Sequence, residues 1–301
     1  MMNSDTRQKT TSDAWCLRYA SHLGYRSPET PLFAFSARDS GPLAQVDLAA
    51  DLGLAGVQYA LARGSSLADQ TAVAARLQHH GLATGCMLYA PFEVIRKPYL
   101  GRPGALSREV FVGQIRAALE VSRRINSHQI VVLAAADPEI PHDLQMEALV
   151  EHLRYAAELV QSAGVVLELE GVFSSVLPPL ILQRLDDVVA VIRRVDSPNV
   201  RLIYDTAHVQ ALDGDAAGHL ARVFDYIDIV QFADHPGRLE PGSGSIDFES
   251  ILTELGRRGF GGLVELEHSW SQSGVEGERQ GLESLRRLDA RVYQRLRQPP
   301  A

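Results

Sequence analysis

Four apolar runs in the second half of the chain each end in a side chain that carries a carboxylate or an amide oxygen. These residues are Glu170, Asp205, Gln231 and Glu267. A carboxylate in an apolar segment is costly to bury unless it is paired or bound to a cation. If the four runs are neighbouring strands, their ends meet, and we expect one divalent cation between them. Oxygen ligands favour Mg²⁺ or Mn²⁺, with Zn²⁺ as an alternative.

Other residues near these positions could take part. Glu168 and Glu265 each precede a candidate ligand by two residues and share its side of the strand, so a shifted register would make either one the ligand. Each could instead be a deeper carboxylate that is paired with a basic side chain. His208 and His235 lie close enough in sequence to join the cation or to bind a substrate.

The segment 233–246, with the sequence ADHPGRLEPGSGSI, is the most distinctive stretch of the chain. Its glycines and prolines predict a loop with a fixed course. Arg238 lies within it, and a guanidinium can hold a carboxylate or phosphate through two parallel hydrogen bonds. Arg238 is therefore a candidate for binding substrate, and a surface arginine in a structured turn is the alternative.

Eight strand-like runs alternate with segments of helical periodicity. The expected strands are 17–23, 56–60, 82–89, 129–134, 165–170, 200–205, 227–232 and 263–267. Expected helices include 66–80, 107–124, 142–163 and 276–297. This alternation predicts an α/β fold, a closed (β/α)8 TIM barrel in a single domain, whose active site would lie at the carboxyl ends of the strands. An open doubly wound sheet is second, because the expected glycine-rich phosphate loop is missing after the first strand.

Length and charge agree with such a domain. The 301 residues are 46% hydrophobic, which suffices for one barrel with its core. The formal net charge of −8 argues against a nucleic-acid partner, because phosphate contacts need a basic face. Cys16 and Cys86 are far apart in sequence, so neither a disulfide framework nor a cysteine zinc site is expected, and a cytoplasmic location fits.

The domain limits follow from the same composition. Residues 1–14 are polar and predict a disordered tail rather than a signal peptide, with the barrel domain covering 15–301. No apolar run reaches the roughly 20 residues of a membrane helix, so no membrane partner is expected. Barrels of this kind often form dimers, and the sequence leaves open whether this protein is a homo-oligomer.

The segment 164–268 resembles the hydroxypyruvate isomerase family, within the xylose isomerase-like superfamily of sugar phosphate isomerases and epimerases. The stretches that carry the resemblance are VVLELEG, SPNVRLIYDTAHVQALDGD, IVQFADHPGRLEPGSGSIDF and GFGGLVELEH. The third stretch is the most specific, because it is a long motif in which Asp, Pro, Gly, Arg and Glu follow one another in a defined order. The first half of the chain is similar only as a generic barrel of that superfamily.

The resemblance implies roles for the candidate residues. Those that would hold one divalent metal ion are Glu170, Asp205, Gln231 and Glu267. Glu170 and Glu267 would also face each other across the substrate as acid and base. His208 would hydrogen-bond a substrate oxygen, and Arg238 would hold the acidic or polar end. The implied reaction isomerises or epimerises a small sugar or hydroxy-keto acid through a metal-stabilised enediolate.

Two positions depart from the family's pattern. The family usually has Asn three residues after the glutamate of the fifth strand and often Pro directly after it, whereas this chain has Phe173 and Gly171. The wall that faces the substrate is therefore expected to differ, and with it the substrate.

Three other functions remain open. A dehydratase of a keto-sugar or an inositol derivative would use the same metal and the same proton abstraction. An endonuclease of the AP-endonuclease type would need several zinc ions and histidines at the early strand ends, where this chain has Tyr59, Ala60, Tyr89 and Ala90. A barrel that binds a small polar ligand without catalysis would retain no metal.

Overall fold

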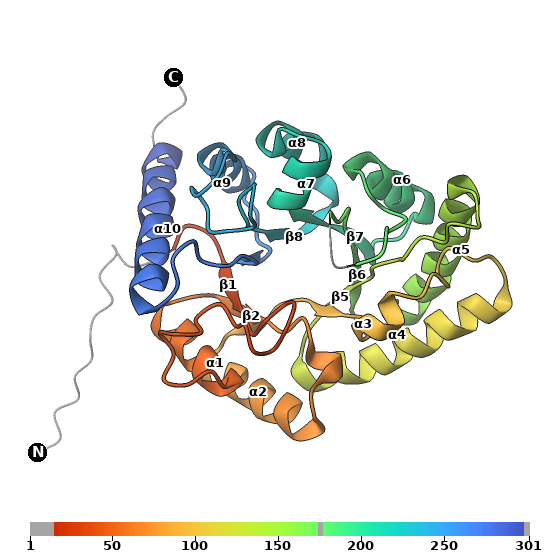
Figure 1. Ribbon diagram of the computed structural model, residues 1–301, viewed down its shortest axis with the longest axis horizontal. Helices are drawn as coiled ribbons and strands as arrows, with labels where there is room; N and C mark the ends of the chain where they lie inside the picture. The colour runs from red at the N-terminus through yellow and green to blue at the C-terminus, as the bar shows by residue number, and fades with distance from the viewer. Residues whose placement is uncertain (1–14, 174–176, 298–301) are drawn as a thin grey trace, which may run out of the picture.

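The computed structural model describes residues 15–173 and 177–297; the expected tail, 1–14, lies outside them. One parallel sheet has the strand order β3-β2-β1-β9-β8-β7-β6-β5-β4. The strands are β1 (Tyr19–His22), β2 (Gly56–Gln58), β3 (Ala83–Thr84), β4 (Met87–Leu88), β5 (Gln129–Val131), β6 (Val166–Leu169), β7 (Val200–Asp205), β8 (Ile227–Gln231) and β9 (Val264–Glu265). Figure 1 shows them as a central ring with helices around it.

The ring closes through residues 82–89, which the sequence predicted to form a single strand, the third in chain order. β3 pairs with β2, and β4, only two residues further on, pairs with β5. Backbone bonds continue on both sides, because the amide of Leu88 donates to Ala60 O (2.9 Å) and that of Tyr89 to Val131 O (3.0 Å). The closed barrel is therefore confirmed, and the prediction of a continuous strand over 82–89 is wrong.

Gly85 and Cys86 explain why that strand divides. The Cys86 amide donates to Oε1 of Glu265, 2.8 Å away, so it is unavailable to a neighbouring strand. A Cβ on Gly85 would lie 2.3 Å from the same oxygen and 3.0 Å from the Cα of Gln58. The backbone thus turns toward a buried carboxylate here, and only glycine fits the close approach.

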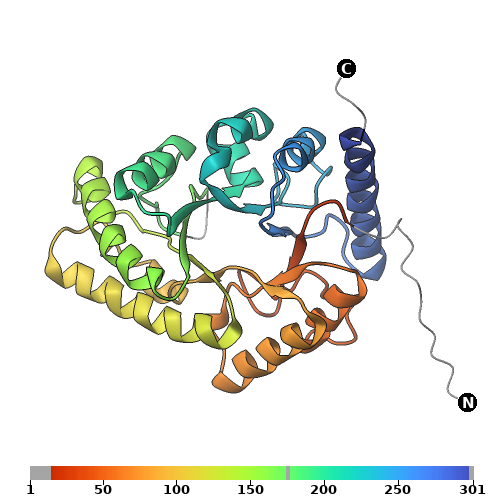
Figure 2. The same ribbon diagram turned by 180° about the vertical axis from the view of Figure 1, so that it is seen from behind.

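Helices cover the outside of the barrel, as both views show (Figures 1 and 2). They are α1 (Pro42–Asp51), α2 (Leu67–His80), α3 (Phe92–Ile95), α4 (Ala105–Ile125), α5 (His142–Gln161), α6 (Leu185–Val195), α7 (Thr206–Leu212), α8 (Ala216–Val223), α9 (Phe248–Arg257) and α10 (Val275–Leu296), with short 3-10 helices at Ala62–Gly64 and Phe224–Tyr226. Ser66 caps α2 through the Asp69 amide, and Gly81 ends it in the left-handed region at φ 67°. The four predicted helical segments match α2, α4, α5 and α10 to within two residues at each end.

Alternation along β6 gives the sheet two different faces. Leu167 and Leu169 are fully buried and alternate with Glu168 and Glu170, so apolar and acidic side chains leave the strand on opposite sides. Glu170 lines a cavity at the mouth of the barrel. The apolar face therefore packs toward the helices, and the acidic face points into the barrel. In the part of the chain that the structure describes, none of the helices has the length and hydropathy needed to cross a membrane.

Candidate functional site

A cavity of about 90 Å³, partly open to solvent, lies at the carboxyl ends of the strands. Its polar lining is formed by Tyr25, Arg26, Gln58, Glu170, His208, Gln231, Arg238 and Glu267. Asp205 lies directly behind Arg238 and contacts it. The six residues that the sequence singled out for metal or substrate are thus brought together, whereas His235 does not line the cavity.

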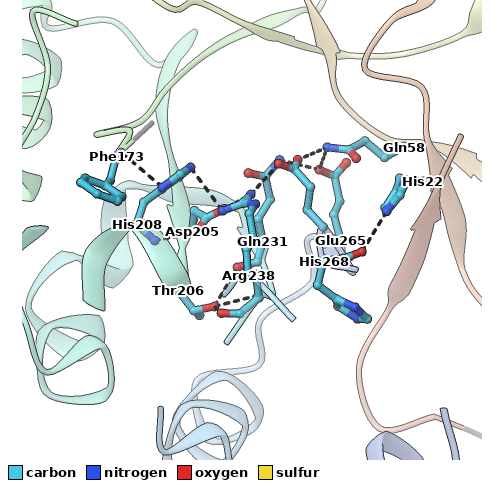
Figure 3. Close-up of polar contacts among 12 residues, drawn as sticks. His22, Gln58, Phe173, Asp205, Thr206, His208, Gln231, Arg238, Glu265 and His268 are labelled. Carbon is cyan, nitrogen blue, oxygen red and sulfur yellow. Dashed lines mark hydrogen bonds and ion pairs between the residues drawn. The ribbon is translucent and has the colours of Figure 1, made fainter. Parts of the chain in front are cut away.

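Arg238 is at the centre of this polar group (Figure 3). Its Nη2 lies 2.6 Å from Oδ2 of Asp205 and 2.6 Å from Oε1 of Glu267. Its Nη1 lies 3.2 Å from Nε2 of His208, and its guanidinium stands 5.3 Å from the centre of the Tyr25 ring. Burial of three charges is tolerable only because each is compensated by a neighbour.

Three of the cavity's potential ligand atoms lie close together. Glu170, Asp205 and His208 each offer one atom, and these atoms lie within 4.8 Å of one another. Asp205 ends β7, and its Oδ1 accepts the backbone amide of His208 at 2.9 Å, so it also caps α7. The imidazole therefore lies next to two candidate ligands, which is the position that the sequence-based alternative of His208 as a metal ligand requires.

Three residues that line the cavity, Gln58, Glu170 and Gln231, each have a buried side-chain oxygen without a hydrogen-bond donor. The amide nitrogen of Gln231 donates to Oε2 of Glu265 at 3.0 Å, which leaves Oε1 of Gln231 buried and without a partner. Oε2 of Glu170 is buried without a partner in the same way. Buried polar atoms are rarely left unsatisfied, and oxygen acceptors can be satisfied by a hard cation. The residues of this cavity therefore fit a divalent metal ion.

Glu265 is a deeper carboxylate and does not line the cavity. Its Oε1 accepts the Cys86 amide, and its Oε2 accepts both Gln58 and Gln231, each at 3.0 Å. Glu168 is also fully buried, and burial together with the neighbouring Asp228 raises the pKa of its carboxyl well above the usual range. Both residues thus lie deeper than the candidate ligands, but the expected pairing with a basic side chain is wrong for Glu265, whose partners are Gln58, Gln231 and Cys86. Among the residues that the structure describes, no ion pair is found for Glu168 either.

Burial shifts the pKa values of the two glutamates at the mouth. Desolvation, partly offset by Arg238, raises the pKa of Glu267 from 4.5 to about 7. Desolvation and the nearby Asp205 raise the pKa of Glu170 well above its usual range. Desolvation lowers the pKa of His208 to about 4, so its imidazole is neutral at physiological pH. A carboxyl with a pKa near 7 can both accept and return a proton there.

The loop that carries Arg238 is held by one buried carboxylate. Oδ1 of Asp234 accepts the amides of His235 (2.8 Å) and Ile246 (3.1 Å), and Oδ2 accepts those of Gly242 (2.9 Å) and Gly244 (2.8 Å). Arg238 itself has a φ of 55°, which is uncommon for a residue with a side chain. The Asp234 network therefore fixes a strained turn that aims Arg238 at the carboxylates.

Sequence reasoning missed Gln58, Tyr25 and the role of Asp234. Nε2 of Gln58 donates to Oε2 of Glu267 at 2.5 Å, so β2 also contributes to the polar group. The signal for Gln58 was a polar side chain at the end of an expected strand. Asp234 was visible as an acidic residue ahead of several glycines, and nothing in the sequence marked Tyr25.

The remaining lining of the cavity is apolar. It comes from the ends of β2, β4 and β5, from α3 and from the segment that follows β6. These side chains are Ala60, Leu88, Phe92, Val131, Leu133, Val172, Phe173 and Leu177, and the thiol of Cys86 completes the lining. The Phe173 side chain is 60% exposed at the rim, and its backbone amide donates to Nδ1 of His208 at 3.2 Å.

Known proteins share both the fold and parts of the sequence. A hydroxypyruvate isomerase of Escherichia coli strain K12 is 27% identical over 231 residues, which cover 75% of this chain and 87% of that protein. A 2-oxo-tetronate isomerase of Cupriavidus necator is 29% identical over 198 residues, which cover 64% of this chain and 75% of that protein.

Solved structures agree on the fold. A protein described as AP endonuclease, family 2, from Brucella melitensis superposes with a TM-score of 0.74 at 21% identity, covering 87% of this chain and 96% of that one. A 3-keto-D-glucoside 4-epimerase from E. coli superposes with a TM-score of 0.70 at 20% identity, covering 90% of this chain and 99% of that one. Residues 46–288 match the family described as xylose isomerase-like TIM barrel, and the chain therefore belongs to that family.

Proposed function

We propose that this protein is a divalent-metal-dependent isomerase or epimerase of a small hydroxy-carbonyl compound, in the class of sugars and hydroxy-keto acids. The observation that carries the proposal is the pair of unsatisfied buried oxygens, Glu170 Oε2 and Gln231 Oε1, in the cavity that Glu267 also lines. The relatives named hydroxypyruvate isomerase and 2-oxo-tetronate isomerase support the same class of reaction.

The residues proposed to hold the metal are Glu170, Asp205, Gln231 and Glu267, with His208 as a further candidate because of its place beside two of them. Such a set combines three carboxylates, an amide oxygen and a neutral imidazole, and Mg²⁺ and Mn²⁺ accept oxygen-rich sets. When bound, a divalent cation would stabilise negative charge on the carbonyl and neighbouring hydroxyl oxygens of the substrate.

Glu170 and Glu267 are proposed to move the proton. They stand at the ends of β6 and β9, with β7 and β8 between them, so a substrate over Gln231 has one carboxylate on each side. In the metal-free protein burial raises the pKa of Glu267 to about 7; once ionised, its carboxylate could accept a proton from carbon and return it. Exchange on one face gives isomerisation, and relay between the two faces gives epimerisation.

His208 and Arg238 are proposed to hold the substrate. The neutral His208 can hydrogen-bond a hydroxyl or carbonyl oxygen, and Arg238 can keep one hydrogen bond to a carboxylate while it turns another N–H to the substrate. Within the described residues, one group of potential metal ligands is found at this mouth. A single cation suits proton transfer better than it suits a three-zinc nuclease.

Solvent deuterium exchange tests this proposal. The protein is incubated in deuterated buffer with hydroxy-ketones and hydroxy-aldehydes, with Mn²⁺, with Mg²⁺, or with a chelator. We expect deuterium at the carbon next to the carbonyl of at least one compound, dependent on metal, and slower by about a hundredfold or more in Glu267→Gln. Full exchange in folded, metal-loaded Glu170→Gln and Glu267→Gln variants would overturn the proposal.

A further inference from the structure

The cavity has two unlike sides. Its apolar side is formed by Leu88, Phe92, Val131, Leu133, Val172 and Leu177. In the closed ring, β4 and β5 stand across the barrel from β8 and β9, which present Gln231 and Glu267. A molecule whose reacting end lies at the glutamates therefore has the rest of its length against hydrocarbon.

Hydrocarbon suits only some substrates. The side chains of Leu88, Val131 and Leu133 are all less than 9% exposed and present no hydrogen-bonding atom. Each hydroxyl of a polyhydroxylated chain that leaves water for this surface loses hydrogen bonds and gains none. An alkyl or aryl group gains instead, because it removes its own apolar surface and that of the wall from water.

The rim of the cavity is apolar beside this wall. Phe173 adds an aromatic ring at the entrance and is 60% exposed. Its side chain offers no hydrogen-bonding atom to a substrate hydroxyl. The exposed ring and the buried wall are separate observations with the same consequence.

We infer that the substrate is a hydroxy-carbonyl compound with an apolar, alkyl or aryl substituent, and that the wall at β4 and β5 binds this substituent. The inference rests on the proposed function, because the reacting end must lie at Glu170 and Glu267. It goes beyond that function by separating this protein's substrate from the polyhydroxylated sugars.

Binding measurements on the Mn²⁺-loaded protein test the inference. Calorimetry compares hydroxyacetone, homologues lengthened by one to three methylenes at the methyl end, and erythrulose, a polyhydroxylated ketone with the same number of carbons as the shortest homologue. We expect affinity to rise up to about fourfold with each added methylene, and the longest homologue to bind more tightly than erythrulose. The inference is overturned if affinity does not rise along the series, which includes the case of no detectable binding. It is also overturned if erythrulose binds more tightly than the longest homologue.

Two isosteric variants locate the effect on the wall. Val131 lines the cavity, whereas its neighbour Val132 is equally buried and does not line it. We expect Val131→Thr to weaken binding of the longest homologue by about five- to tenfold and to leave hydroxyacetone unchanged, with no such selectivity in Val132→Thr. Equal effects of the two variants on affinity contradict the inference.

Deuterium exchange distinguishes a failure of the proposed function from a failure of the inferred substrate class. If erythrulose exchanges its proton in a metal-dependent way and binds more tightly than the lengthened homologues, the proposed function holds and the apolar substrate class falls. If affinity rises along the homologous series while no compound exchanges, the wall binds as inferred and the proposed chemistry fails.

Discussion

The mouth of the barrel consists of two arcs that are alike in backbone and opposite in chemistry. The ends of β6 to β9 present carboxylates and an amide around Arg238, whereas the ends of β4 and β5 present Leu88, Val131 and Leu133. Parallel strands deliver both sets to the same level. The fold therefore fixes only where a side chain stands, and residue type divides the mouth into a polar side, where we propose the chemistry, and an apolar side, where we propose recognition.

The arcs also differ in how their members depend on each other. In the polar arc each buried charge is compensated by a neighbour, as Arg238 is by Asp205 and Glu267, so loss of one leaves the others uncompensated. In the apolar arc each side chain contributes its own buried area. The effects of substitutions on stability and binding should therefore be large and mutually dependent in the polar arc. In the apolar arc they should be small and nearly additive.

The largest effect on stability is expected from Arg238→Met. Without the guanidinium, Asp205 and Glu267 become neighbouring buried carboxylates without a cation, which should reduce the free energy of unfolding of metal-free protein by about 3–5 kcal/mol. Saturating Mn²⁺ should restore a large part of that loss, because a cation again lies between the carboxylates. Urea denaturation with and without Mn²⁺ measures both; an equal loss in the two conditions would contradict this view of the arc.

The raised pKa of Glu267 predicts a pH dependence of about 3 kcal/mol. Because its pKa is about 7 in the folded protein and 4.5 ordinarily, the protonated form is favoured by folding. This contribution is present below pH 4.5 and is lost as the pH rises to 7. Metal-free wild-type protein should therefore lose stability over that range relative to Glu267→Gln.

Proton release upon metal binding gives a second measurement of the same group. At pH 6 Glu267 is mostly protonated, so Mn²⁺ binding should release protons, and Glu267→Gln should release close to one fewer. Calorimetry in buffers of different ionisation enthalpy counts them. Equal release by the variant and the wild type at pH 6 would show that Glu267 is already ionised.

A smaller effect is expected from Asp234→Asn, which acts on the polar arc through its loop. Asparagine turns an NH₂ toward backbone amides that now donate to Oδ1 or Oδ2, which should cost about 1–3 kcal/mol and misplace Arg238. Asp247→Asn, at the other end of the loop, caps α9 and is the matched control. Asp247→Asn should change stability little, because asparagine caps a helix about as well as aspartate, and only Asp234→Asn should weaken Mn²⁺ affinity and deuterium exchange.

The polar arc was predictable from sequence because a carboxylate in an apolar run is conspicuous. Glu170, Asp205, Gln231 and Glu267 stand out at the ends of strand-like segments, and the alternation of strands and helices predicts the level at which they meet. Gln58 was less visible, because one amide on an early strand is common and its partner Glu267 lies 209 residues away.

The apolar arc could not be predicted in the same way. Val131 and Val132 are both buried valines in the expected strand 129–134, and only the closed ring shows that the first faces the cavity and the second does not. The division of 82–89 into β3 and β4 also depends on a distant residue, because Glu265 binds the Cys86 amide from across the chain. The local sequence pattern indicates neither which valine faces the cavity nor where the strand divides.

The smallest effect on stability, and the one that most sharpens the contrast between the arcs, is expected from Phe173→Asn. The ring is 60% exposed, so the free energy of unfolding should change by less than about 0.5 kcal/mol. The ratio of affinities for a lengthened hydroxyacetone homologue and for erythrulose should nevertheless fall by about threefold, because apolar surface at the rim is replaced by an amide. Phe35→Asn, at a 55% exposed position that does not line the cavity, is the matched control. If both variants change the ratio equally, the rim does not belong to the apolar arc, and recognition is confined to the buried wall.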